Sequence, residues 1–230
     1  MATGRVSSSR GRGERFWGGG MRGRRWREGL ARLAMLALLS LAGASLAKAG
    51  PFEDAGRAYD RGDYATAARL YRDWAEQGHG NAQDLLGAMY EAGIGVNRDF
   101  AEAARWWRKA ADQGYPSPQN SLGAAYYRGR GVTQDYGKAS KWYERAADQG
   151  HAKAQYNLGI MYADGTGVPQ DYVIAHMWLN LAAAHLNPGP EHDDAMKRRD
   201  ALAARMTPDQ VGEAQKRARE FRPEVWRKKA

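Results

Sequence analysis

The stretch Ala82-Gln83-Asp84-Leu85-Leu86-Gly87-Ala88-Met89-Tyr90 decides the fold, because its pattern returns twice further along the chain. Its Leu-Gly pair recurs as Leu122-Gly123 and Leu158-Gly159, in steps of 36 residues. Tyr90 recurs at the same steps as Tyr126 and Tyr162. A period of this length is typical of an array of helix pairs, in which each pair buries its apolar face only against its neighbours.

Each repeat predicts a first helix followed by a glycine turn. Leu86 and Tyr90 are four residues apart and therefore share one face of a helix. Gly87 has no side chain, so we expect a neighbouring helix to approach closely there. The turn Gly93-Ile94-Gly95-Val96 recurs in each repeat, and its glycines permit positive φ and end the first helix. A dinucleotide-binding loop is not indicated, because a third glycine and a preceding strand are missing.

A second helix follows each turn. Aspartates recur just before it at 36-residue steps, and we expect them to cap its free N–H groups. They are Asp63, Asp99, Asp135 and Asp171. Trp106, Trp142 and Trp178 recur within the second helix among small alanines. Aromatic side chains at helical spacing favour a buried core over a ligand platform.

These motifs resemble the Sel-one-like repeat family, a branch of the tetratricopeptide superfamily. The resemblance covers residues 81–187 as three repeats, and 50–80 more loosely as a shortened first unit. It implies an all-α fold, a right-handed α-solenoid whose concave groove holds partner proteins. One cysteine-rich branch of the family has been described as acting on β-lactams. That implication does not carry over, because this chain has no cysteine.

Residues 188–230 predict capping helices and a basic tail. A helix is expected from Glu191 to about Met206, and Thr207-Pro208-Asp209-Gln210 then offers a capping box. The next apolar stripe consists of Val211, Ala214, Ala218 and Phe221. We expect these helices to cover the exposed end of the array. The acidic start of the first one, with His192, favours helix-dipole pairing over a metal site.

Residues 1–49 predict a disordered basic segment followed by a secretory signal peptide. An apolar stretch, 33–47, follows several arginines and ends in the small-x-small pattern Ala47-Lys48-Ala49, which predicts cleavage after Ala49. Met21 is the more natural start of such a leader. A periplasmic or secreted protein is therefore expected, with an uncleaved membrane anchor as the alternative.

The charge of +9 lies mostly in this leader, whose ten Lys/Arg and two Asp/Glu give +8. The remaining 25 Lys/Arg and 24 Asp/Glu leave +1, so no nucleic-acid partner is predicted. A membrane contact is expected only through an uncleaved leader. The absence of cysteine excludes disulfides and Cys-based metal sites, and no metal or other cofactor is predicted.

The sequence predicts a non-catalytic scaffold that binds a protein or peptide. No nucleophile–base pair stands out, and His79 and His151 occupy equivalent turns, which indicates an architectural role. The first helices are expected to line the groove, so the positions that vary on them are the candidate contacts. These are Asp84, Glu91, Asn120, Tyr127, Arg128, Lys153 and Tyr156. A cell-envelope hydrolase acting on peptidoglycan or β-lactams, and a membrane-tethered assembly factor, remain the alternatives.

Overall fold

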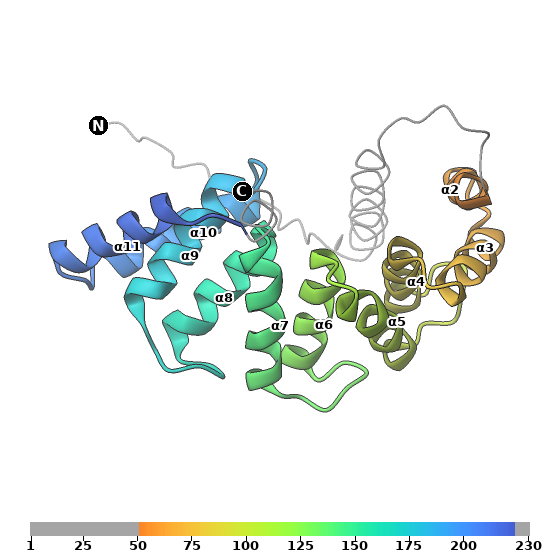
Figure 1. Ribbon diagram of the computed structural model, residues 1–230, viewed down its shortest axis with the longest axis horizontal. Helices are drawn as coiled ribbons and strands as arrows, with labels where there is room; N and C mark the ends of the chain where they lie inside the picture. The colour runs from red at the N-terminus through yellow and green to blue at the C-terminus, as the bar shows by residue number, and fades with distance from the viewer. Residues whose placement is uncertain (1–50, 224–230) are drawn as a thin grey trace, which may run out of the picture. The chain divides into compact units, whose positions relative to one another are not determined.

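The computed structural model describes residues 51–223, and within this range the chain forms ten α-helices and no strand (Figure 1). The helices are α2 (Pro51–Asp60), α3 (Tyr64–Glu76), α4 (Gly80–Ala92), α5 (Phe100–Asp112), α6 (Pro116–Arg128), α7 (Tyr136–Asp148), α8 (Ala152–Asp164), α9 (Tyr172–His185), α10 (Pro190–Ala203) and α11 (Pro208–Glu220). The predicted leader, its cleavage site, the start at Met21 and the tail from Glu224 onward lie outside the described residues.

The described helices stack in chain order, which confirms the all-α solenoid. Each first helix packs on its own second helix, as α4 does on α5, α6 on α7 and α8 on α9. Each second helix packs in turn on the next first helix, from α3 on α4 to α9 on α10. The last helix departs from this order, because α11 returns to pack on α9.

The four repeated aspartates cap the second helices as predicted. The Asp99 side chain accepts hydrogen bonds from the backbone N–H groups of Ala101 and Glu102, at 2.8 and 3.0 Å. Asp63, Asp135 and Asp171 each accept one such bond at the start of α3, α7 and α9. One residue type thus satisfies one or two of the free donors at the start of every second helix from α3 to α9.

The repeated Leu-Gly pairs pack each first helix tightly on its second helix. Leu86, Leu122 and Leu158 are buried, as are Trp106, Trp142 and Trp178. The glycine after each leucine lies under a side chain of the second helix. A β-carbon on Gly123 would approach the Tyr143 ring to 2.8 Å. One on Gly87 would approach the Trp107 ring to 2.6 Å, and one on Gly159 would approach Leu179 to 2.8 Å. The expected close approach is therefore present, and a side chain of the second helix makes it.

The repeated tyrosines join successive repeats. The Arg72 guanidinium on α3 donates to the Tyr90 hydroxyl at 2.6 Å, and Arg108 on α5 donates in the same way to Tyr126. At the next step Glu144 stands in the place of this arginine. Burial is the main cause that raises the pKa of the Tyr162 hydroxyl, and the negative charge of Glu144 raises it further.

A buried glutamine in each first helix joins three helices, a role that the repeat pattern alone does not reveal. Gln119 donates through Nε2 to the Ala111 carbonyl at the end of α5, at 3.2 Å. Its Oε1 accepts from Gln149 at the end of α7, at 2.8 Å. Gln83 repeats both bonds, with Ala75 and Gln113. Each glutamine therefore ties its first helix to the second helices on both sides.

The third repeat keeps this arrangement with a histidine in place of the last glutamine. Gln155 donates to the Ala147 carbonyl at 3.2 Å, and its Oε1 lies 3.2 Å from Nδ1 of His185. Because that oxygen can only accept, His185 donates through Nδ1. His185 stands 36 residues after Gln149, so it takes the place of the repeated glutamine.

The two C-terminal helices complete the array. α10 begins at Pro190 and ends at Ala203, slightly before the predicted end near Met206. The predicted capping box at Thr207 is present at the start of α11. Ala214 and Ala218 are buried, and the Phe221 ring meets the Trp178 ring edge-on, 5.4 Å between centroids. α11 therefore buries its apolar stripe against α9.

Candidate partner-binding surface

The seven predicted contact residues all lie on the first helices of the three full repeats. α4 carries Asp84 and Glu91, α6 carries Asn120, Tyr127 and Arg128, and α8 carries Lys153 and Tyr156. The structure divides them into two sets. One set joins one first helix to the next, and the other stands clear of these junctions.

Asp84, Asn120 and Tyr156 occupy one repeat position, and each faces the following first helix. Asn120 Oδ1 accepts a hydrogen bond from Asn157 of α8 at 3.1 Å. The Tyr156 hydroxyl donates to the Asp194 carboxylate of α10. Asp84 is in contact with Ser117 of α6. This position varies because each junction has its own pair of side chains.

Asp84 is corrected as a candidate contact, because its side chain is buried. The residue is only 6% exposed, between Ser117 of α6 and Trp107 of α5. Burial raises the pKa of its carboxyl to about 6, and the polar groups of the neighbouring Ser117 and Trp107 offset part of that rise. A partner could reach this group only after the junction opened.

Lys153 and Tyr156 are already engaged by α10. Lys153 Nζ lies 3.0 Å from the Glu191 carboxylate, and both side chains are about half exposed. Asp194 accepts from Tyr156 and also from Nε of Arg198, at 2.5 Å. Burial and the bond to Asp194 raise the pKa of Tyr156. The chain's own helix thus occupies the surface that the sequence assigned to a partner.

Glu91, Tyr127 and Arg128 remain clear of these junctions, at the C-terminal ends of α4 and α6. Arg128 is exposed, and Glu91 is partly exposed with no ion pair to any described residue. The Tyr127 ring meets the Tyr136 ring edge-on at 5.1 Å, and Tyr136 is 39% exposed. Aromatic and arginine side chains are enriched among residues that dominate binding energy.

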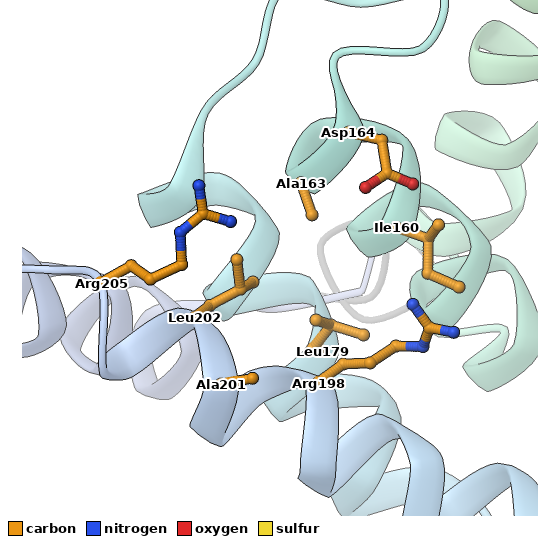
Figure 2. A pocket seen from close by; sticks show the side chains of 8 residues that line it. All are labelled: Ile160, Ala163, Asp164, Leu179, Arg198, Ala201, Leu202 and Arg205. Carbon is orange, nitrogen blue, oxygen red and sulfur yellow. The ribbon is translucent and has the colours of Figure 1, made fainter.

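A cleft continues this surface at the third repeat (Figure 2). Ala163 and Asp164 stand 36 residues after Tyr127 and Arg128, at the end of α8. Together with α9, α10 and the turn after α10 they line an open cleft of about 160 Å³. The lining residues are Ile160, Ala163, Asp164, Leu179, Arg198, Ala201, Leu202 and Arg205. The sequence does not reveal this cleft, because its walls lie about 40 residues apart in the chain.

Three further observations on the described residues concern a metal site, the histidines and a membrane span. Between residues 51 and 223 no group of three His, Cys, Asp or Glu side chains could hold a metal ion. His192 lies 3.0 Å from the neighbouring Asp193, at the start of α10. His151 accepts from the backbone of Ala154 at 3.2 Å, and burial lowers the pKa of its ring to about 4. No described helix is both long and apolar enough to span a bilayer.

Comparison with known proteins places this architecture in a family. The model of the Sel1 repeat matches residues 50–79, 80–115, 119–151 and 152–185. Among the curated proteins none matches the chain.

Two solved structures are similar. A Sel1 repeat protein from Oxalobacter formigenes is 30% identical over 66% of this chain, with a TM-score of 0.60. A protective antigen of uropathogenic Escherichia coli with an SLR fold is 36% identical over 70% of this chain, with a TM-score of 0.54. The chain spans 59% and 33% of the lengths of these two proteins. The chain therefore belongs to the Sel1 repeat family, whose repeats typically serve as scaffolds for protein interaction.

Proposed function

We propose that this chain is an exported, non-catalytic scaffold that binds a partner protein or peptide on the surface of its first helices. The observation that carries the proposal is the position of Glu91, Tyr127 and Arg128. These side chains lie on equivalent turns of successive repeats, outside the contacts that join one first helix to the next. Arg128 is exposed and Glu91 partly exposed, while Tyr127 packs one side of its ring against the core and Tyr136 and remains partly exposed.

Three of the histidines occupy structural positions in the array. His79 and His151 occupy the N-cap positions of α4 and α8, and His185 bonds to Gln155. Each of these groups has an architectural position.

The proposal of export rests on the leader sequence, whose arginines, apolar stretch and Ala47-Lys48-Ala49 site are typical of a secretory signal. The near-neutral charge of residues 50–230 favours a protein partner over a nucleic acid.

The double substitution Tyr127→Ala with Arg128→Glu should weaken capture of the partner from a cell-envelope extract by at least about tenfold. An aromatic or arginine side chain at the centre of an interface typically contributes about 2 kcal/mol or more. The measurement is the amount of partner retained on the tagged full-length chain. Lys141→Glu, an exposed charge reversal on α7, is the matched control and should retain the partner. Equal capture by the double variant and the wild type would overturn the proposal.

A further inference from the structure

The cleft between α8 and α10 lies where Ala163 stands in place of the Tyr127 ring of the second repeat. In the second repeat the Tyr127 ring packs against Tyr136. In the third repeat the equivalent residues are Ala163 and Tyr172, so the ring of the first helix is missing. Arg205 lies over the Tyr172 ring instead, 4.6 Å from its centroid, and donates to its hydroxyl. The space beside Ala163 remains open.

The floor of this cleft is apolar and has the size of one side chain. Ile160 forms the partly exposed floor, above Leu179 and Leu202, which are 0% and 6% exposed, and the open cleft has a volume of about 160 Å³. An apolar cavity of about 150 Å³ is large enough to hold benzene. The cleft can therefore take one bulky apolar side chain, such as leucine or phenylalanine.

Two guanidinium groups flank this floor on opposite sides (Figure 2). Arg198 uses its Nε on Asp194, and Arg205 uses one terminal nitrogen on Tyr172, so other N–H groups of both remain available. Asp164 also lines the cleft and forms no ion pair with any described residue. Its carboxylate can accept a backbone N–H, while the arginines can bind a carboxylate in a bidentate manner.

We infer that the cleft binds a segment of a partner protein that inserts one bulky apolar side chain and places an acidic residue beside it. The inference rests on the proposed scaffold function and names the chemistry of the partner. The chain's own segments outside the described residues suit the cleft poorly. Residues 1–49 carry a net +8, and the tail places Arg227, Lys228 and Lys229 next to its Trp226. These cations would face Arg198 and Arg205.

The test selects short random peptides, displayed on phage, against the full-length chain. We expect enriched peptides to share a bulky apolar residue adjacent to Asp or Glu. Ala163→Tyr restores the side chain of the second repeat and should weaken their binding by at least about tenfold. Arg205→Glu should weaken it similarly, and Arg205→Lys less. Lys216→Glu, the same charge change at an exposed site on α11, should have no effect.

A second variant that fills the cleft controls for misfolding of Ala163→Tyr. Ala201 is exposed on the opposite wall, so Ala201→Phe fills the cleft without disturbing the core. Binding that survives both Ala163→Tyr and Ala201→Phe overturns the inference, as does enrichment of no peptide or of peptides without an acidic residue. Binding that appears only after removal of residues 224–230 overturns it as well, in favour of the chain's own tail. If these variants bind normally while the Tyr127 and Arg128 double variant loses its partner, the cleft inference fails and the scaffold proposal stands.

Discussion

Replacing Gly131 by alanine should lower the free energy of unfolding by about 4 kcal/mol, which is near the upper end for a single substitution. Gly131 has φ +72°, and a β-carbon there would lie 1.9 Å from the Phe100 carbonyl oxygen and 2.6 Å from the Ala101 nitrogen. Both are backbone atoms at the start of α5, so no change of rotamer relieves the overlap. The turn of the second repeat would have to lift off the preceding repeat.

Gly114 provides the matched control for this substitution. It also has positive φ, +93°, but a β-carbon there meets no atom within 4 Å. Gly114→Ala should therefore cost only the left-handed backbone conformation, about 1 kcal/mol. Chemical unfolding of the two variants beside the wild type measures both effects. Similar losses for Gly131→Ala and Gly114→Ala would show that the turn does not rest on α5 as described.

The second large effect concerns Asp84. Its pKa is raised by burial to about 6 in the folded chain, against an ordinary value of 3.8. The folded state therefore holds this proton more tightly than the unfolded state does. The resulting stabilisation is fully present below pH 3.8 and is lost as the pH rises through about 6. At about 1.4 kcal/mol for each pH unit, the loss is roughly 3 kcal/mol.

Asp84→Asn should accordingly raise the free energy of unfolding by roughly 3 kcal/mol at pH 7.5 relative to wild type. The two proteins should converge below about pH 3, where Asp84 is largely protonated in both states. Denaturant titrations across this range give the difference directly. Asp73→Asn, the same substitution at an exposed position on α3, is the matched control and should change stability little. A constant difference between Asp84→Asn and wild type would contradict the burial of this carboxylate.

The repeat period, the aspartate caps, the buried tryptophans and the glycine turns could all be predicted from the sequence. Each depends on local chemistry: Asp99 caps a helix that begins beside it, and Gly93 ends one in the left-handed conformation, with φ +69°. The capping box at Thr207 is equally local. Such features require only the residues within one or two helical turns.

The contacts between repeats could not be predicted in this way. The repeat shows that the residue at the position of Asp84, Asn120 and Tyr156 differs from one repeat to the next. Such differences are expected if the position is exposed, and they are equally expected if it is buried against a different neighbour at each junction. The burial of Asp84 depends on Ser117 and Trp107, which belong to two other helices. The return of α11 to α9, and the approach of Arg205 to Ala163, depend on packing over still longer separations.

The most direct test of partner binding on the first helices is site-specific photo-crosslinking in the cell envelope. A photoreactive amino acid placed at Glu91, Tyr127 or Arg128 should crosslink the same partner, since all three side chains lie at one end of the first helices. The same probe at Lys141, exposed on α7, should not crosslink it. Crosslinks from Lys141, with none from the three first-helix positions, would place the partner on the second helices. That result would contradict binding on the first helices.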